Sequence, residues 1–341
     1  MRVLVTGATG FVGSHSLIAL VRAGHEVRAL VRDLGKLERV IAAHDVAMPD
    51  AVVGDITDET CVSRALDGCE SVIHTAAVVA VAGGKKSDET RRTNVRGVEL
   101  VIGGAHTRGF RSIVYVSSAS AIFTPGTGKI TRDSPLARWQ SDYALSKADA
   151  ERYVRELQEA GAHIRTTYPP GVIGPHDPGM SDANYAVLTF IRQMLLRTSS
   201  GYETLDVRDL GAIHTALVDP ALPAGRYVIG GHFQPWGEVI DLMRNLTGRH
   251  IPAPAVPGAV MRALGRTGDL IRRIYPMKFP LTSEAMDHAT QWPGLQSSPE
   301  MDKLDVPRRS PRETYEDTIR WMHRAGHLTD KQVGHLASSR S

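Results

Sequence analysis

Cysteine is scarce in this chain, which has only Cys61 and Cys69 among its 341 residues. Two cysteines cannot form a disulfide framework, so we expect a reduced, cytoplasmic setting. The chain also lacks an apolar run of the ~18 residues that a membrane-spanning helix needs. Its charge is balanced, with 40 basic and 37 acidic residues, which argues against a nucleic-acid-binding surface. We therefore expect no nucleic acid partner, no membrane partner and no signal peptide before the first strand.

The first residues of the chain contain a glycine-rich motif. Residues 3–6 favour a β-strand and run directly into glycines, after which a helical pattern extends to about residue 23. Gly7 permits a tight strand-to-helix turn, Gly10 lets the backbone approach a pyrophosphate, and Gly13 lets the helix pack closely on the strand. The helix N-terminus then offers free N–H groups to phosphates. The motif therefore predicts a dinucleotide-binding loop.

Strands and helices alternate along the first half of the chain, as in a parallel sheet covered on both faces. Further strands are predicted at 25–31, 51–53, 71–77, 112–118, 163–168 and 226–229, and helices at 90–107, 143–160, 184–196, 206–219, 236–247 and 311–324. We predict the α/β class, with a doubly wound parallel sheet (Rossmann) built from residues 1–170 and about 206–230. A smaller, mostly helical C-terminal substrate-binding region is expected at 171–205 and 231–330, followed by a flexible tail at 331–341.

Several residues follow the predicted strands on the side where a dinucleotide lies in such sheets. Arg32 follows the second strand, where its planar guanidinium suits the 2′-phosphate of NADP. NADP is therefore preferred, although Asp33 leaves NAD open. Asp55-Ile56 closes the third strand near the expected adenine edge, and the small pair Ala76-Ala77 ends the fourth. Asn94, inside a predicted helix, is expected to tie that helix to a neighbouring strand or to hold a water near the site.

Tyr143 and Lys147 are four residues apart at the start of a predicted helix, so they share one face. A free tyrosine has a pKa of about 10, which is too high for acid–base work near neutrality. A nearby ammonium stabilises the phenolate and lowers that pKa. The strand 112–118 ends in Ser117 and Ser118, whose hydroxyls could donate a hydrogen bond to a substrate carbonyl while the tyrosine exchanges its proton. This spacing indicates carbonyl reduction or alcohol oxidation.

These motifs occur in the order that is typical of a known family. They are Thr6-Gly-Ala-Thr-Gly-Phe-Val-Gly13, Asp55-Ile56, Asn94-Val95, Ser117-Ser118-Ala119, Tyr143 to Lys147, and Pro169-Pro-Gly-Val-Ile-Gly-Pro175. The chain resembles the extended short-chain dehydrogenases/reductases, also described as the NAD-dependent epimerase/dehydratase family. Within it, the chain is similar to the dihydroflavonol-reductase-like and 3β-hydroxysteroid-dehydrogenase-like branch. The resemblance is specific over residues 1 to about 230.

The resemblance implies a role for each motif residue. It makes Tyr143 the acid/base, Lys147 the ligand of the nicotinamide ribose and Ser118 the residue that orients the substrate carbonyl, with Ser117 and Ser120 as rivals for the serine role. The expected cofactor contacts are Gly7, Thr9, Gly10, Phe11, Val12, Gly13, Arg32, Asp55, Ile56, Ala76, Ala77, Asn94, Ser117, Tyr143, Lys147, Pro170 and Val172. Sugar-nucleotide epimerases usually carry a diphosphate-binding asparagine where this chain has Gly171, which counts against a sugar-nucleotide substrate.

We therefore predict an NAD(P)-dependent oxidoreductase that interconverts a carbonyl and a secondary alcohol on a fairly apolar small molecule by hydride transfer. An NAD-dependent sugar-nucleotide epimerase or dehydratase is the alternative, which the arginines at 262, 266, 272 and 273 leave open. A cofactor-sensing protein without turnover is a third interpretation. The resemblance also implies a homodimer through the helices 90–107 and 143–160. No metal is expected, because His323 and His327 lack a third ligand and Gly326 interrupts their helix.

Residues 257–280 place Val260, Leu264 and Ile271 at helical spacing, with arginines between them. This pattern predicts one or two amphipathic helices. Such a segment suits a lid over the nicotinamide end of the cleft, an oligomer contact, an interfacial membrane helix or plain packing. We favour the lid, because the segment lies in the region expected to bind substrate.

Overall fold

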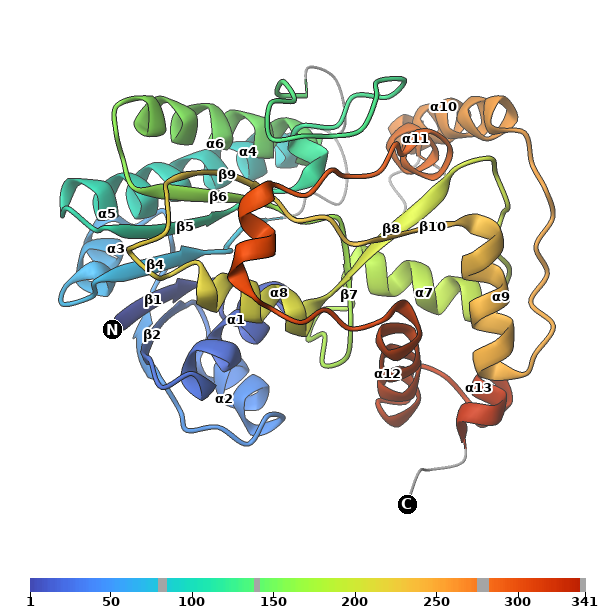
Figure 1. The fold of residues 1–341 in the computed structure, drawn as a ribbon, viewed down its shortest axis with the longest axis horizontal. Helices are drawn as coiled ribbons and strands as arrows, with labels where there is room; N and C mark the ends of the chain where they lie inside the picture. Colours follow the sequence, from blue (N-terminus) through green and yellow to red (C-terminus); the bar gives the residue numbers. More distant parts are fainter. Residues whose placement is uncertain (79–84, 138–141, 275–281, 338–341) are drawn as a thin grey trace.

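The computed structural model describes residues 1–78, 85–137, 142–274 and 282–337, and within these every side chain except those of 85–90, 142–144, 272–274 and 284. Two sheets form the framework (Figure 1). The larger has seven strands, all parallel, in the order β3-β2-β1-β4-β5-β6-β9. This is the strand order of a doubly wound nucleotide-binding sheet extended by one strand, which confirms the predicted fold class.

The strands and helices have the following bounds. The strands are β1 (Arg2–Thr6), β2 (Glu26–Val31), β3 (Asp50–Val53), β4 (Ser71–His74), β5 (Ser112–Val116), β6 (Ile164–Tyr168), β7 (Gly171–Ile173), β8 (Gly201–Asp206), β9 (Gly225–Val228) and β10 (His232–Pro235). The helices are α1 (Phe11–Arg22), α2 (Leu34–Ala42), α3 (Glu59–Leu66), α4 (Lys85–Val98), α5 (Gly104–Thr107), α6 (Asp142–Glu159), α7 (Asp182–Arg192), α8 (Val207–Ala216), α9 (Trp236–Thr247), α10 (Gly258–Ile274), α11 (Ser283–Gln291), α12 (Pro311–Arg324) and α13 (Asp330–Val333). A π-helical turn, Glu99–Gly103, joins α4 to α5, so the predicted helix 90–107 is one continuous unit that begins earlier. None of the described helices is both long enough and apolar enough to cross a bilayer.

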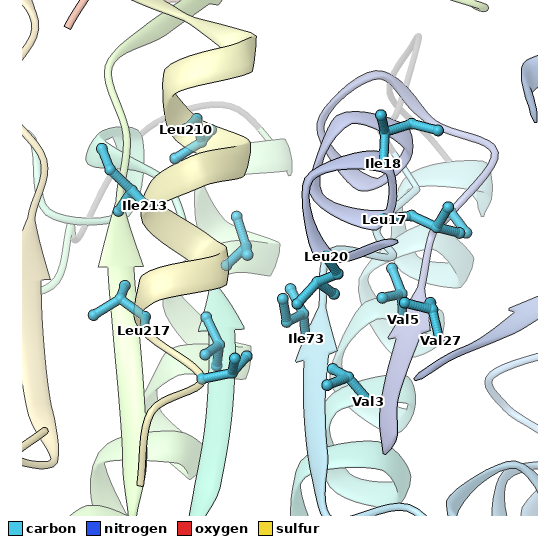
Figure 2. Packing of buried hydrophobic residues seen from close by; sticks show 14 of the residues in the cluster. Val3, Val5, Leu17, Ile18, Leu20, Val27, Ile73, Leu210, Ile213 and Leu217 are labelled. Carbon is cyan, nitrogen blue, oxygen red and sulfur yellow. The ribbon is translucent and has the colours of Figure 1, made fainter. Parts of the chain in front are cut away.

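Both faces of the larger sheet are buried by helices. On one face, Val3 and Val5 of β1 belong to a buried cluster that also contains Leu17 of α1 and Leu210 of α8, all labelled in Figure 2. On the other face, Leu4 of β1 packs in a second cluster with side chains of α3, α5 and α6. Successive residues of a strand point to opposite faces, so a strand buried on both sides is apolar throughout.

The chain leaves the larger sheet after β6 and then returns to it. α8 packs on α1 through Gly211, where a Cβ would lie 2.7 Å from the backbone oxygen of His15. β9 pairs in parallel with β6 and forms the edge of the sheet. The strand order therefore brings residues 207–228 back beside the nucleotide-binding elements.

The remaining elements form a C-terminal region, shown on the right of Figure 1. Its small sheet has the order β10-β8-β7, with β7 parallel and β10 antiparallel to β8. Side chains of α7, α9, α12 and α13 form its core. The flexible tail predicted from residue 331 is wrong as far as 337, because Val333 and Leu336 are buried in this core.

The structure also corrects element bounds. β4 ends at His74 and β5 at Val116, so the small and hydroxyl residues that were assigned to strand ends stand in the loops that follow. α2, α3, β7, β8, β10, α11 and α13 were not predicted. The three missed strands form the small sheet, whose pairing joins segments far apart in the sequence.

Candidate functional site

The glycine-rich loop between β1 and α1 has room only for backbone. Gly7 has a positive φ of 74°, and a Cβ there would lie 2.7 Å from the backbone nitrogen of Ala76. A Cβ at Gly13 would lie 2.1 Å from the oxygen of Gly7. Gly10 precedes α1 and offers no side chain to cap the first N–H groups of the helix. These uncapped donors at a helix N-terminus fit the pyrophosphate of a dinucleotide. Thr9, Phe11 and Val12 lie in the same loop and first turn.

The loop after β4 is held beside this turn by Thr6. The Thr6 oxygen accepts hydrogen bonds from Thr75 N (3.3 Å) and Thr75 Oγ1 (2.8 Å), and Thr6 Oγ1 accepts one from Ala76 N at 3.4 Å. Ala76 and Ala77 are half-buried. The two small residues therefore follow the strand end next to the glycine loop, where the sequence places the cofactor.

Asn94 is buried in α4 and connects three elements. Its Oδ1 accepts a hydrogen bond from Val78 N at 2.7 Å, and its Nδ2 donates to Val78 O at 3.0 Å and to Ser146 Oγ at 3.1 Å. Asn94 therefore joins α4 to the loop after β4 and to α6, and not to a strand as the sequence analysis expected.

The predicted adenosine end of the site is polar and open. Arg32 is exposed directly after β2, and no ion pair to another described residue involves it. Asp33 instead caps α2, accepting a hydrogen bond from Lys36 N at 2.9 Å. Asp55 accepts hydrogen bonds from Thr57 N (2.9 Å) and Thr57 Oγ1 (2.7 Å).

Ile56, beside that turn, is fitted against α4. A Cβ at Gly97 of α4 would lie 2.5 Å from Ile56 Cδ1, so the two segments are in close contact. The Asp55-Ile56 pair is therefore held in a fixed position at the end of β3.

Lys147 lies on the second turn of α6 with its side chain buried. Its Nζ donates a hydrogen bond to Val116 O, the last residue of β5, at 3.0 Å, and lies 5.7 Å from the ring centre of Tyr115. Burial lowers the pKa of Lys147 to about 8, and the charge of Glu151 opposes that shift. Tyr143 lies in the first turn of the same helix, four residues earlier, and its side chain lies outside the described residues.

The three candidate serines have different surroundings. Ser117 is buried, and its hydroxyl donates to Glu151 Oε2 at 2.7 Å. Ser118 is half-buried and its Oγ accepts a hydrogen bond from Ser120 N at 3.2 Å, which leaves its own hydroxyl hydrogen unused in that bond. Ser120 is also half-buried, in the 3₁₀ turn Ala119–Ala121. Ser117 therefore has a partner inside the protein, whereas Ser118 and Ser120 are partly exposed in the segment after β5.

Glu151 is a residue of this site that the sequence analysis missed. Its carboxylate is fully buried and accepts hydrogen bonds from Ser117 Oγ, from the Tyr168 hydroxyl and from Arg155 Nε at 2.8 Å. The nearby carboxylate and burial raise the pKa of Tyr168 well above its ordinary value, with burial the larger cause. The available signal was spacing, because Glu151 is one helical turn beyond Lys147, as Lys147 is beyond Tyr143.

Pro170 and Val172 are half-buried where the chain passes from β6 to β7. Gly171 between them has no space for a side chain: a Cβ would lie 2.5 Å from the Tyr202 hydroxyl and 3.0 Å from the backbone oxygen of Glu203. The packing of β7 on β8 therefore leaves no room for an asparagine side chain at this position.

Three histidines contact other side chains of the protein. His74 is buried in β4, with its Nδ1 2.7 Å from Thr6 Oγ1, and burial together with the Lys147 charge lowers its pKa to about 3. His323 Nε2 pairs with Asp330 at 2.6 Å, and the ring of His327 lies against Trp321. Within the described ranges, no group of three His, Cys, Asp or Glu side chains could hold a metal ion.

Comparison with known proteins agrees with this geometry. The model of the family described as "NAD dependent epimerase/dehydratase family" matches residues 3–230. The chain is 27% identical to sterol demethylase protein B of Methylococcus capsulatus over 96% of this chain and 99% of the relative. It is also 27% identical to a provisionally named dihydroflavonol 4-reductase of Synechocystis sp. over 95% of both chains.

A solved structure shares the fold over nearly the whole chain. It is the crystal structure of UDP-glucose 4-epimerase from Bifidobacterium longum in complex with NAD+ and UDP, with a TM-score of 0.72 and 21% identity over 96% of this chain and 99% of the other. The likeness covers both the larger sheet and the C-terminal region. The chain is therefore an enzyme of the NAD-dependent epimerase/dehydratase family.

Proposed function

We propose that this enzyme interconverts a carbonyl and a secondary alcohol on a fairly apolar small molecule, with NADP as the preferred cofactor and Ser118, Tyr143 and Lys147 as the catalytic residues. The observation that carries the proposal is the position of Lys147. It is a buried ammonium on α6, one helical turn from Tyr143, and it donates a hydrogen bond to Val116 O at the end of β5, two residues before Ser118.

The residues divide the chemistry between them. The bound nicotinamide supplies or accepts the hydride. Lys147 places a positive charge in a low-dielectric site, where it stabilises a tyrosine phenolate more strongly than it would in water. Tyr143 then gives a proton to the substrate oxygen or removes one from it, and Ser118 donates a hydrogen bond to the same oxygen. The uncapped N-terminus of α1 would hold the pyrophosphate of the cofactor.

The preference for NADP rests on Arg32 and Asp33. Asp33 uses one carboxylate oxygen to cap α2, whereas Arg32 is exposed and has no ion-pair partner among the described residues. A free guanidinium binds a 2′-phosphate with two parallel hydrogen bonds, an arrangement that NAD cannot use.

A sugar-nucleotide epimerase is the alternative, since the UDP-glucose 4-epimerase named above shares the fold. The residue that argues against it is Gly171. Sugar-nucleotide epimerases usually carry an asparagine at this position, and in this chain Tyr202 occupies the space that the asparagine side chain would need. The full-length likeness to a sterol demethylase protein and to a reductase supports an apolar substrate. We also propose a cytoplasmic homodimer that forms through α4 and α6.

Tyr143→Phe tests the mechanism. The variant should retain its fold and bind NADPH, but lose turnover with aryl and cyclic ketones by at least 100-fold, because a general acid–base group contributes about 10²–10⁴ in rate. The measurement is NADPH oxidation under saturating cofactor. Tyr185→Phe, which removes the hydroxyl of a tyrosine that is 55% exposed, is the matched control and should keep full activity. Near-full activity in Tyr143→Phe would show that the mechanism is wrong.

A further inference from the structure

Tyr202 of β8 carries a hydroxyl to which no described residue forms a hydrogen bond. The side chain is half-buried, and the fold does not enclose its oxygen completely. A phenylalanine would fill the same space, so packing alone does not account for the hydroxyl. A polar group that is partly withdrawn from water without a partner costs free energy, and a hydrogen bond to a ligand offsets that cost.

The ring of Tyr202 is held in place by its neighbours. It stacks on Trp236 with 5.6 Å between the ring centres and 18° between the planes. Trp236 is itself buried, donates a hydrogen bond from Nε1 to Ala289 O of α11 at 2.8 Å, and meets Phe190 edge-on with 5.9 Å between the ring centres. A hydroxyl on a fixed ring loses little conformational freedom when it binds a ligand.

The Tyr202 hydroxyl lies at the edge of the larger sheet that also carries Ser118. β5 and β6 are parallel neighbours, so the segments that follow them leave the sheet at the same edge. Ala119 N, directly after Ser118, donates a hydrogen bond to Pro169 O, directly after β6, at 3.1 Å. Two residues later, a Cβ at Gly171 would lie 2.5 Å from the Tyr202 hydroxyl. Open α/β sheets bind their ligands at this carboxyl edge.

The surroundings of the hydroxyl indicate which kind of ligand group it binds. Burial, and to a smaller extent the charge of Asp182, raises the pKa of Tyr202 above its ordinary value, so the phenol is neutral. Burial likewise keeps the nearby Tyr315 neutral by raising its pKa. A neutral hydroxyl pairs with a carbonyl, hydroxyl or ether oxygen. It offers no positive charge to a phosphate or carboxylate, and Asp182 repels an anion.

We propose that Tyr202 is a specificity-determining residue, whose hydroxyl binds a second, uncharged oxygen of the substrate, separate from the oxygen that reacts. This inference rests on the proposed function and narrows its substrate class. The substrate is then an apolar molecule with one oxygen at Ser118 and another oxygen at Tyr202.

Tyr202→Phe tests the contact with paired ketones. The probes are cyclohexanone, acetophenone and β-tetralone, each compared with the derivative that carries a hydroxyl at the far end of the ring system. In at least one pair, the wild-type chain should show a KM about fivefold lower for the hydroxylated ketone, because a neutral hydrogen bond contributes roughly this factor. Tyr202→Phe should remove that difference and keep the wild-type kcat on the ketones without a hydroxyl, since Tyr202 does not touch the reacting oxygen.

Tyr185→Phe is the matched control, because it removes the hydroxyl of an exposed tyrosine, and it should keep the wild-type preference. Thermal unfolding of Tyr202→Phe should be unchanged, as expected for a hydroxyl without a partner among the described residues. A melting temperature that falls by several degrees in this variant alone would show that the hydroxyl serves the fold, and would overturn the proposal.

Calorimetric titration separates this inference from the proposed function. The same ketones are titrated into chain saturated with NADP or NAD, whichever binds more tightly, so that no turnover is needed. A hydroxyl preference that Tyr202→Phe removes supports the inference even if no ketone is reduced, in which case the proposed function alone fails. Reduction of ketones without a hydroxyl preference in any pair, a preference that survives in Tyr202→Phe, or no binding of any probe would overturn the inference.

Discussion

The two regions of the molecule each bury a glutamate, and they use it differently. In the nucleotide region, meaning the seven-stranded sheet with its helices, Glu151 accepts hydrogen bonds from the side chains of Ser117, Tyr168 and Arg155. In the C-terminal region, Glu203 of β8 accepts hydrogen bonds from Gly231 N (2.9 Å), Leu295 N (2.8 Å) and Trp292 Nε1 (3.0 Å).

The difference shows what each carboxylate stabilises. Burying a charged group is costly unless hydrogen bonds and opposite charge compensate it. Ionisable neighbours compensate the burial of the Glu151 carboxylate. The charge of Glu151 also raises the pKa of Lys147, one helical turn away. Glu203 is compensated mainly by backbone groups, and it thereby joins β8, the turn after β9 and the segment after α11. Glu151 supports a site, and Glu203 supports the assembly of the C-terminal region.

Gly13→Ala should produce the largest effect, because the nucleotide region depends on backbone contact at this point. A Cβ placed 2.1 Å from Gly7 O must push α1 away from β1. We expect a loss of about 3 kcal/mol in the free energy of unfolding and about 100-fold in NADPH affinity. Chemical denaturation and fluorescence titration measure the two. Gly237→Ala in α9, where a Cβ meets no atom within 4 Å, is the control; equal losses in both variants would contradict this prediction.

Glu151→Gln and Glu203→Gln test the comparison directly. Glu151→Gln leaves the half-buried Arg155 without its ionic partner and should lower the free energy of unfolding by about 3 kcal/mol. Glu203→Gln can keep the acceptor oxygen that serves Trp292 Nε1 and Leu295 N and lose only the one that serves Gly231 N, so we expect a smaller loss of about 1 kcal/mol. Urea denaturation measures both.

The pH profile separates the two roles. Lys147 must be protonated to act, and its pKa of about 8 ends activity on the alkaline side. Because the Glu151 charge raises that pKa, Glu151→Gln should move the alkaline limb of kcat to lower pH, while Glu203→Gln should leave it in place. If the alkaline limb of the kcat profile does not move in Glu151→Gln, Glu151 has a purely structural role.

Arg32→Ala tests whether a residue of the nucleotide region contributes to cofactor binding without contributing to stability. The side chain is exposed, so its removal should leave the stability of the nucleotide region unchanged. It should weaken NADPH by about 10- to 100-fold and NADH little, because hydrogen bonds to a charged group contribute about 1.5–3 kcal/mol. Calorimetric titration with both cofactors decides it, with Arg92→Ala as an exposed control. Equal loss for both cofactors would exclude a 2′-phosphate contact.

Acid should destabilise the nucleotide region through its buried histidines. Burial lowers the pKa of His214 to about 3, and that of His74 likewise. The folded pKa lies below the unfolded value of about 6.5, so the stabilising contribution is complete above pH 6.5 and is lost as pH falls toward 3. Each histidine contributes a slope of about 1.4 kcal/mol per pH unit in that window.

His214→Asn should remove one such slope, measured by denaturation at a series of pH values between 7 and 5. His250→Asn, at an exposed position before Ile251, is the control and should keep the wild-type slope. The slope is the readout, since His214 also contacts Ser16 and Thr167 and its loss lowers stability at every pH. An unchanged slope in His214→Asn would mean that this histidine is protonated in the folded chain.

The nucleotide region was largely predictable from sequence, and the C-terminal region much less so. The structural roles of Gly7 and Gly13 can be predicted from the few residues around them, because a strand, a tight turn and a helix each depend on local sequence. β8 has no such local signal, because its place depends on pairing with β7 and β10, whose paired residues are about 30 positions away on each side. The sequence predicted neither the small sheet nor the packing of Val333 and Leu336 against it and its helices.

The sequence alone therefore determined the parallel βαβ architecture, the glycine loop and the helical register of Tyr143 with Lys147, since each depends on spacing within one or two adjacent elements. Only the tertiary structure decided which serine is engaged inside the protein and why Gly171 has no side chain. Ser117 meets Glu151 because β5 lies beside α6, and Gly171 meets Tyr202 because β7 pairs with β8. Contacts between residues more than thirty positions apart depend on how elements pack, and no periodicity within one segment encodes them.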